Sequence, residues 1–312
     1  MTQTLAIGNY TPDETQKLES EFAPLFLDDP TQIGTLDAAL RDQIKAVAYK
    51  GHHPFGPDAM AQLPALGIIA NYGVGYDAID VAVATHNGIK ITNTPDVLND
   101  DVADLAVGMI LMHGRQMAQA SSWMRSGHWA GKGAFALNRK VSGSTAGILG
   151  LGRIGREIAV RLEAFKMDIH YWSRSEKDTL GYIYHDDPVA LAGAVDYLVV
   201  ALVGGAETQR MVSADVLSAL GENGVLVNIS RGSTVDEAAL FTALETGTIN
   251  GAALDVFDNE PQIDPRFYAL DNVVLQPHQG SGTVETRAAM AALQRDNISA
   301  FLNGAPLVTP VN

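Results

Sequence analysis

The chain has 312 residues, of which 46% are hydrophobic and 18% are charged, and this is typical of a globular protein of about two domains. Its net charge of −15 disfavours nucleic acids and anionic membranes as partners, because both repel an acidic surface, and the absence of cysteine excludes disulfides and thiolate chemistry. We expect a cytoplasmic protein, because the start MTQTLAIGNY lacks a signal-peptide pattern and no apolar run reaches the roughly 20 residues that span a bilayer.

Four short apolar runs in the first third predict buried strands. They are residues 4–9, 44–50, 66–72 and 89–93. The stretches between them suit crossover helices, so we expect a small parallel sheet covered on both faces. Residues 99–117 begin with Asn and Asp caps and are apolar at helical spacing, and we place a domain boundary just before this helix.

The next segment, residues 121–143, is rich in Gly, Ser and aromatic residues and is interpreted as a long loop or arm. A second series of strands follows: residues 145–150, 168–172, 195–202, 224–230, 251–257 and 272–277. Helical stretches lie between most of them, which predicts a doubly wound parallel α/β sheet of the Rossmann type. The last helix, residues 283–304, can cross back to the first domain. We therefore expect a discontinuous domain of residues 1–97 and 285–312 and a second domain of residues 98–284.

A glycine-rich loop opens the second series of strands. Gly150, Gly152 and Gly155 form a G-x-G-x-x-G pattern directly after an apolar strand and directly before an amphipathic helix. The first glycine allows a tight turn, the second lets the backbone approach a pyrophosphate, and the third lets helix and strand pack closely. Helix N-terminal N–H groups then face the anion. This context predicts dinucleotide binding, and a purely structural turn is the alternative.

The second strand of this domain ends without the acid that usually holds the ribose hydroxyls of NAD. Ser173, Arg174 and Ser175 stand there instead. A carboxylate would repel a 2′-phosphate by roughly 4 kcal/mol at about 4 Å and an effective dielectric constant of about 20. Arg174 can pair with the phosphate oxygens, and both serine hydroxyls can donate to the same group. The sequence thus favours NADPH over NADH, the alternative being a solvated polar turn.

Polar side chains follow three later strands, at the edge where ligands of open α/β sheets collect. Arg231 follows one strand, Asp255 and Glu260 follow the next, and His278 follows the last. Reduction of a 2-keto acid places negative charge on the carbonyl oxygen, which must then be protonated. His278 suits a general acid, Glu260 would favour its imidazolium form, and Arg231 can bind the substrate carboxylate and keto oxygen. No His, Asp or Glu cluster has metal-ligand spacing, so we expect no metal site.

Nearly the whole chain resembles the D-isomer-specific 2-hydroxyacid dehydrogenases. The segments GILGLGRIG, NISRG, DVFDNEP and PHQGSG are similar to motifs of that family in order and spacing. The resemblance implies a triad of Arg231, Glu260 and His278, and a contact of Asp255 with the nicotinamide amide. It also implies that the segment NYGVGYDAIDV is a substrate loop. By the same resemblance, Val74 and Gly75 bind the substrate carboxylate through backbone N–H groups, and Tyr72, Arg231 and His278 are further substrate-binding residues. Without the resemblance, the glycines of this segment indicate only a flexible turn.

The resemblance extends the expected cofactor site beyond the motif glycines. The residues concerned are Gly150, Leu151, Gly152, Arg153, Ile154, Gly155, Ser173, Arg174, Ser175, Val203, Thr208, Ile229, Ser230, Arg231, Asp255, His278 and Gly280. Within the family, the chain looks most like NADPH-dependent glyoxylate/hydroxypyruvate and hydroxyphenylpyruvate reductases. Such proteins are usually homodimers that exchange the helix from about residue 99 and the following arm. Trp129 in that arm either closes the partner's active site or packs in the dimer.

The substrate's side chain is left open by the sequence. His52, His53 and Phe55 lie where other family members line the side-chain pocket, and they are either pocket residues or ordinary loop residues. Glyoxylate, hydroxypyruvate, and aromatic or sugar-derived 2-keto acids therefore all stay possible. A dinucleotide-sensing interaction protein is an alternative of another class. An NAD-dependent biosynthetic dehydrogenase would need an acid after the strand IHYW, and none is present.

Overall fold

The computed structural model of the protein describes residues 3–179 and 181–312. The chain divides into two compact units, one of residues 1–98 and 283–312 and one of residues 99–282. From the sequence, the boundaries were expected at 97/98 and 284/285. None of the helices in the described ranges combines the length and the apolar character that a membrane span requires.

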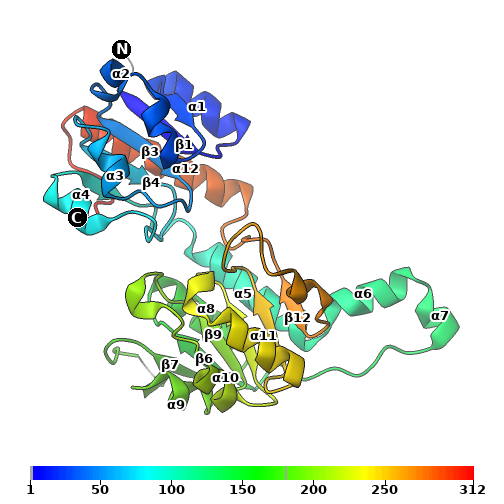
Figure 1. The fold of residues 1–312 in the computed structure, drawn as a ribbon. Helices are drawn as coiled ribbons and strands as arrows, with labels where there is room; N and C mark the ends of the chain where they lie inside the picture. The colour runs from blue at the N-terminus through cyan, green and yellow to red at the C-terminus, as the bar shows by residue number, and fades with distance from the viewer. Residues whose placement is uncertain (1–2, 180) are drawn as a thin grey trace. The chain divides into compact units, whose positions relative to one another are not determined.

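The first unit is built on a five-stranded parallel sheet of order β2-β1-β3-β4-β5, the flavodoxin-like order (Figure 1). Its strands are β1 (Thr4–Gly8), β2 (Leu25–Leu27), β3 (Ala46–Lys50), β4 (Ile68–Asn71) and β5 (Lys90–Thr92). Its helices are α1 (Pro12–Phe22), α2 (Ala38–Arg41), α3 (Pro57–Ala61), α4 (Val81–His86) and α12 (Val284–Leu302). The sequence did not reveal β2, because a three-residue strand has too few residues to show a pattern.

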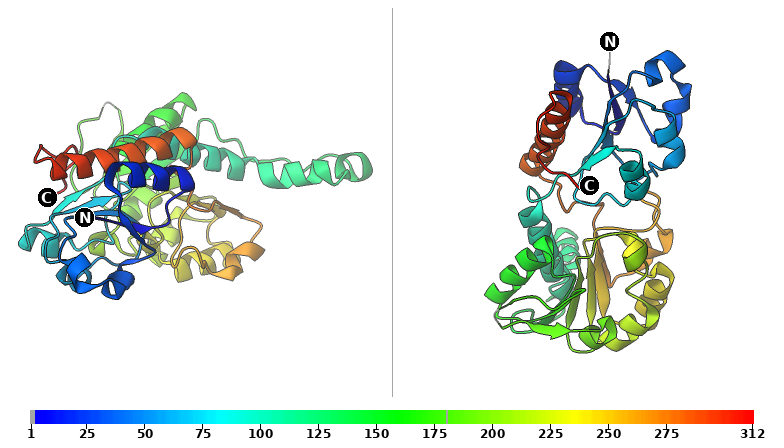
Figure 2. Two further views of the ribbon diagram at one scale, coloured as in Figure 1. Left: turned by 90° about the horizontal axis from the view of Figure 1, so that it is seen from above. Right: turned by 90° about the vertical axis from the view of Figure 1, so that its left-hand side faces the viewer.

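Both faces of this sheet are covered by helices, as expected for buried parallel strands (Figure 2). Alternate strand residues point to opposite faces: Leu5 and Ile7 join the core cluster that includes α3 and α4 residues, whereas Ala6 packs with residues of α1 and α12. The carboxyl-terminal helix α12 thus completes a sheet that begins at the N-terminus, which makes the unit discontinuous.

The second unit contains a seven-stranded parallel sheet of order β12-β11-β10-β9-β6-β7-β8. Its strands are β6 (Thr145–Leu149), β7 (Asp168–Trp172), β8 (Ile183–His185), β9 (Tyr197–Val200), β10 (Val225–Asn228), β11 (Gly251–Leu254) and β12 (Val273–Leu275). Its helices are α5 (Asn99–Gly114), α6 (Met117–Arg125), α7 (His128–Lys132), α8 (Arg153–Ala164), α9 (Pro188–Ala192), α10 (Ala214–Leu220) and α11 (Glu237–Thr246). The strand order reverses between β6 and β9, where ligands of such sheets bind. The expected Rossmann-type sheet is confirmed.

Residues 121–143 were expected to form a loop or an arm, and the loop alternative was wrong for the first half of the segment. Helices α6 and α7 occupy most of residues 117–132 and extend away from the sheet of their own unit (Figure 1). Gln116, Gly127 and Gly133 have positive φ angles of 45°, 70° and 91° and separate or end these helices. The Ser and Gly content lowered the helical signal, because both residue types are weak helix formers.

Candidate active site

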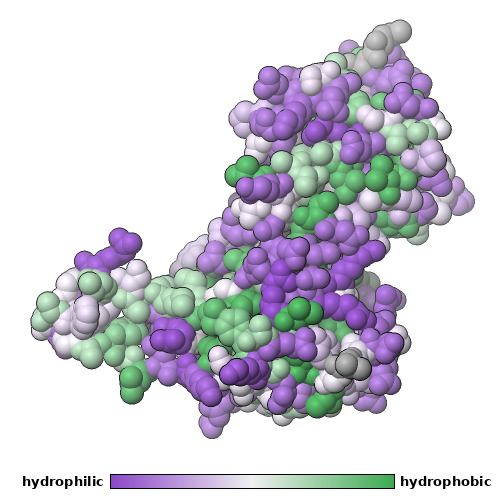
Figure 3. All heavy atoms as spheres, turned by 180° about the vertical axis from the view of Figure 1, so that it is seen from behind, coloured by the Kyte–Doolittle hydropathy of each residue, from purple (hydrophilic) through white to green (hydrophobic). Residues whose placement is uncertain are grey.

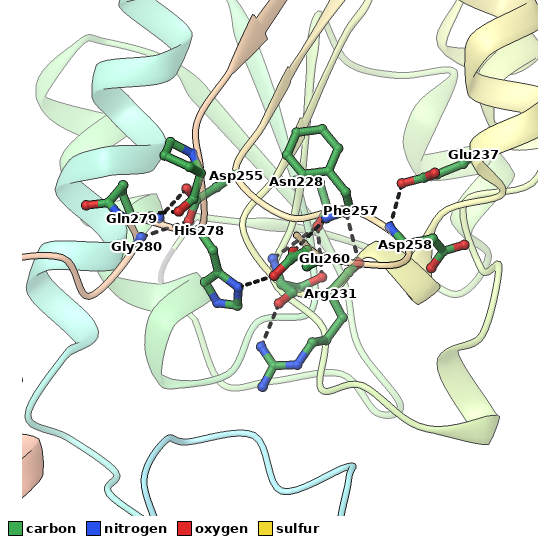
Figure 4. A network of polar contacts seen from close by, with 12 residues as sticks. Asn228, Arg231, Glu237, Asp255, Phe257, Asp258, Glu260, His278, Gln279 and Gly280 are labelled. Carbon is green, nitrogen blue, oxygen red and sulfur yellow. Dashed lines mark hydrogen bonds and ion pairs between the residues drawn. The ribbon is translucent and has the colours of Figure 1, made fainter. Parts of the chain in front are cut away.

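The three predicted catalytic side chains lie on neighbouring turns at one edge of the second unit's sheet (Figure 4). Arg231 follows β10, Glu260 lies on the turn after β11, and His278 follows β12. Because β10, β11 and β12 are adjacent and parallel, their carboxyl ends meet at this edge. The fold therefore brings together residues that lie 47 positions apart, from 231 to 278.

His278 and Glu260 form a close pair. The Nδ1 atom of His278 lies 2.6 Å from Oε2 of Glu260, and the side chains are 32% and 21% exposed. The other carboxylate oxygen of Glu260 accepts a hydrogen bond from the Phe257 N–H at 2.8 Å. The carboxylate is thus placed to accept a hydrogen bond from an Nδ1 proton, and this contact orients the imidazole ring.

The backbone of His278 adopts an uncommon conformation that Asp255 supports. Its φ is 53°, in the left-handed region that residues other than glycine rarely occupy. The Asp255 carbonyl accepts from the His278 N–H at 2.9 Å, and its carboxylate accepts from the N–H groups of Gln279 and Gly280 at 2.6 and 2.8 Å. Burial raises the pKa of Asp255, although these two N–H donors oppose the rise. Asp255 thus holds the turn that aims the histidine.

The turn that carries Arg231 is organised by a buried amide that the sequence did not reveal. Asn228 donates to the Arg231 carbonyl at 3.0 Å and accepts from the Ser230 N–H at 3.0 Å. Gly232 is needed beside it, because a Cβ atom there would lie 2.0 Å from the Phe257 carbonyl carbon and 2.3 Å from the Asp258 nitrogen. The Arg231 turn and the turn that leads to Glu260 are therefore packed backbone against backbone.

A further carboxylate fixes the Glu260 turn from the outside. Oε1 of Glu237, the first residue of α11, accepts a hydrogen bond from the Asp258 N–H at 2.6 Å (Figure 4). Burial raises the pKa of Glu237, and the nearby acids Asp258, Asp264 and Glu260 raise it further. The only sequence signal for this contact was an acidic residue in the first turn of a helix, and that pattern also occurs where the residue stabilises the helix alone.

The glycine loop has the geometry that a pyrophosphate requires. Gly150 has a φ of 107°, and a Cβ atom there would lie 2.7 Å from the Ala201 carbonyl oxygen. At Gly155 a Cβ atom would lie 2.2 Å from the Gly150 carbonyl oxygen, which explains the close packing of α8 on β6. At Gly152 a Cβ atom would meet open space, directly before the N-terminus of α8. Leu151, Arg153 and Ile154 lie between these glycines, and the loop fits a dinucleotide.

The Ser-Arg-Ser turn after β7 forms part of the same edge, since the Gly150 N–H donates to the Trp172 carbonyl at 3.0 Å. Arg174 and Ser175 are exposed. Ser173 differs from the expectation: it is 7% exposed, and its hydroxyl donates to the Ser175 carbonyl at 2.6 Å. Its proton is thus used inside the turn, and Ser173 shapes the turn instead of donating to a ligand.

The remaining expected cofactor residues fall into an exposed and a buried group. Val203 is 65% exposed, and the Thr208 hydroxyl donates to its carbonyl at 2.6 Å. Ile229, Ser230 and Gly280 are buried, so only their main chains can contribute at the surface of the site. The Ser230 hydroxyl donates to Asn228 Oδ1 at 2.9 Å, which gives it a structural role.

In the first unit, the segment after β4 presents two backbone N–H groups. Asn71 donates to the carbonyls of Gly73 and Gly75 at 3.1 and 2.9 Å, and Asn93 donates to the Val74 carbonyl at 2.9 Å. The carbonyls are thus turned toward protein donors. In the described part of the chain, the Val74 and Gly75 N–H groups have no assigned acceptor. Two neighbouring N–H groups of this kind can bind an anion, which is what the predicted carboxylate-binding role requires.

The other expected substrate residues differ in their exposure to solvent. Tyr72 is 8% exposed and donates to the Arg287 carbonyl at 3.0 Å, so its hydroxyl proton is already engaged. His52 and His53 are exposed. Phe55 is fully buried and packs edge-to-face on Tyr49, because an apolar ring gains more from the core than from solvent. Phe55 is therefore a core residue.

Comparisons with known proteins show which family this chain is similar to. A family model of the D-isomer specific 2-hydroxyacid dehydrogenase NAD-binding domain matches residues 107–280. Glyoxylate/hydroxypyruvate reductase A of Arabidopsis thaliana is 48% identical over 273 residues, covering 87% of this chain and 86% of the relative. Hydroxyphenylpyruvate reductase of Plectranthus scutellarioides is 46% identical over 272 residues, covering 86% of each.

A solved structure is similar over the full length. It is the NADPH-dependent glyoxylate/hydroxypyruvate reductase of Sinorhizobium meliloti in complex with NADP and malonate, with a TM-score of 0.94 and 44% identity. The match covers 100% of this chain and 97% of that one. The motifs, the fold and these relatives agree, and the chain belongs to the D-isomer-specific 2-hydroxyacid dehydrogenase family.

Proposed function

We propose that this protein reduces small 2-keto acids such as glyoxylate or hydroxypyruvate to D-2-hydroxy acids with NADPH. The observation that carries the proposal is the 2.6 Å pair of His278 and Glu260 on turns adjacent to that of Arg231. The named relatives reduce glyoxylate, hydroxypyruvate or hydroxyphenylpyruvate, which supports the substrate class. We expect the enzyme to act in the cytoplasm.

Each residue of the triad has one task in this reaction. The bound cofactor supplies a hydride to the carbonyl carbon. Arg231 holds the substrate carboxylate and stabilises the negative charge that develops on the carbonyl oxygen. His278 donates its Nε2 proton to that oxygen, and Glu260 stabilises the imidazolium that makes this donation possible. For the first unit, we propose that the Val74 and Gly75 N–H groups bind a carboxylate.

The preference for NADPH rests on the turn after β7. No acid stands at the end of β7, and exposed Arg174 offers a bidentate partner for a 2′-phosphate. The similar Sinorhizobium meliloti enzyme was solved with NADP, which supports the same cofactor here.

A homodimer belongs to the same proposal. Helices α6 and α7 and the segment after them carry exposed apolar side chains: Met117 at 49%, Met124 at 57%, Trp129 at 64% and Leu137 at 101% exposure. The apolar surface of this arm is visible in Figure 3. A second copy of the chain is the partner that would cover it, because apolar area of this kind is stabilised by burial.

The decisive experiment measures NADPH and NADH oxidation with five acids: glyoxylate, hydroxypyruvate, phenylpyruvate, hydroxyphenylpyruvate and 2-ketogluconate. We expect turnover of glyoxylate or hydroxypyruvate with a preference for NADPH, and its loss in His278→Ala. Highest kcat/KM with an aromatic or sugar-derived acid would reassign the substrate within the same reaction. No turnover of any acid, with intact NADPH binding, would instead favour a dinucleotide-sensing protein.

A further inference from the structure

The turn after β7 is held by a side chain that does not belong to it. Tyr171, the fourth residue of β7, makes two hydrogen bonds to the main chain of Lys177. Its hydroxyl accepts from the Lys177 N–H at 2.8 Å and donates to the Lys177 carbonyl at 3.1 Å. One phenol therefore closes the loop from the strand end to residue 177, a span of six residues along the chain.

Tyr171 is well placed to act as a rigid anchor. It is 1% exposed, and its ring lies 5.4 Å from that of Tyr184 on β8. A buried phenol that lost its partners would leave an unsatisfied polar group, so the two bonds to Lys177 resist opening. Tyr184 adds a long hydrogen bond of 3.4 Å to the Ser173 carbonyl, and the Ser173 hydroxyl bonds the Ser175 carbonyl.

Within the anchored turn, the ammonium group of Lys177 lies beside the hydroxyl of Ser175. Lys177 Nζ lies 3.3 Å from Ser175 Oγ. Residues 174–178 contain two basic and two acidic side chains, since Glu176 and Asp178 alternate with Arg174 and Lys177. The turn as a whole carries no net charge to attract a phosphate. Selectivity for a phosphate monoester must then come from which side chains the backbone places together.

We propose that Tyr171 is a positioning residue for recognition of the cofactor's 2′-phosphate, and that Lys177 is a second cation of that subsite beside Arg174. The buried phenol fixes the main chain at Lys177, so the Lys177 ammonium and the Ser175 hydroxyl face the same phosphate before the cofactor arrives. This inference rests on the proposed NADPH preference and adds the device that produces it.

Binding of NADPH and NADH to the full-length protein tests the inference without depending on a keto acid. The dissociation constants are measured by fluorescence titration for the parent protein, Tyr171→Phe, Lys177→Ala and Arg174→Ala. Tyr182→Phe is the matched control, because the Tyr182 hydroxyl bonds Glu163 at 2.8 Å in the same segment but does not hold the turn. The thermal midpoint of each variant is recorded in parallel.

We expect Tyr171→Phe and Lys177→Ala each to weaken NADPH binding roughly 3- to 10-fold, the range of one lost hydrogen bond or exposed ion pair. NADH binding should change less than about twofold, since NADH has a 2′-hydroxyl at this subsite and no phosphate. Tyr182→Phe should bind both cofactors like the parent. Equal weakening of NADPH and NADH in Tyr171→Phe, or unchanged NADPH binding, would overturn the positioning role.

A second variant covers the case in which Tyr171→Phe does not fold. Lys177→Pro removes the N–H that donates to the phenol and leaves the buried ring in place. We expect it to bind NADPH more weakly than Lys177→Ala, because both lack the ammonium and only the proline variant loses the N–H bond to the phenol, one of the two bonds of the anchor. Equal binding by the two variants would contradict the inference. A parent protein that prefers NADH would instead contradict the proposed function, and the two failures are thus distinct.

Discussion

At the scale of single residues, the pair of Glu260 and His278 is the contact on which the proposed chemistry depends. Glu260 has one oxygen on the Phe257 N–H and the other on the imidazole, so its carboxylate is fixed on both sides. His278 is held in a left-handed backbone conformation by three hydrogen bonds to Asp255. Conformational strain of this kind is retained where surrounding contacts support it, and it is common at active sites.

Replacing Glu260 with Gln tests the charge of this pair while keeping its size. We expect kcat for keto-acid reduction to fall about 100-fold, because the amide no longer stabilises the imidazolium that donates the proton. Steady-state kinetics with glyoxylate measure kcat, and the dissociation constant of NADPH is the control. A kcat equal to that of the parent protein would mean that the charge of Glu260 does not assist the reaction.

At the scale of elements, the loops are shaped by side chains from their neighbours. Asn71, at the end of β4, turns the carbonyls of Gly73 and Gly75 toward itself. Gly232 lets the turn of Arg231 touch the turn that leads to Glu260. The strands determine where each loop begins, and these few contacts determine which way the backbone groups of the loop point. The predicted substrate loop can be tested through Asn71, and the turn that carries Glu260 can be tested through Glu237.

Replacement of Asn71 with Ala should loosen the loop that presents the Val74 and Gly75 N–H groups. We expect KM for the keto acid to rise about tenfold, since two carbonyls lose their donor and the N–H pair is no longer oriented. The dissociation constant of NADPH should not change, because the cofactor site lies in the other unit. Parallel weakening of cofactor and substrate binding would show general damage to the fold instead.

Glu237, which bonds the turn that carries Glu260, should make the stability of the protein depend on pH. Burial raises its pKa, so the carboxylate ionises less readily in the folded than in the unfolded chain. Its contribution to stability is complete below the unfolded pKa of about 4.3 and is lost as the pH rises through the raised folded pKa. In Glu237→Gln this loss should disappear. The stability of the parent relative to the variant should therefore decline as the pH increases from about 4 toward neutrality.

Urea midpoints of the two proteins across this pH range measure the effect. Asp255 also has a raised pKa, but it is present in both proteins and cancels in the difference. Glu245→Gln is the matched control, because Glu245 lies exposed on the same helix α11. Parallel curves for the parent protein and Glu237→Gln would refute the assignment of this pH dependence to Glu237.

At the scale of the whole molecule, the exposed arm is the feature that a single chain leaves unexplained. Met124 on α6 is 57% exposed and Trp129 on α7 is 64% exposed. We expect Met124→Glu to shift a dimer to monomer, because a carboxylate would be buried at the interface. Sedimentation velocity measures the change, with Val189→Glu, at an exposed site on α9, as the control. A parent protein that sediments as a monomer would contradict the dimer.

Sequence alone determined the family and the two parallel sheets, and it predicted the triad. Apolar runs bounded by turn residues report burial directly, and the glycine loop has few alternatives once it lies between a strand and a helix. The expectations for fold and family were confirmed. The residue roles stay predictions, although the fold does bring Glu260 and His278 within 2.6 Å.

Only the tertiary structure decided which neighbours orient those residues. The contacts of Tyr171 with Lys177, Glu237 with Asp258 and Asn71 with Gly75 leave no periodic signal, since each joins one side chain to one backbone group. The same holds for Ser173. From the sequence, its hydroxyl can donate either to a 2′-phosphate or to the turn's own backbone, and the structure shows the bond to the Ser175 carbonyl. Periodicity records which face of an element is buried, whereas the direction of a hydrogen bond depends on where the chain returns in space.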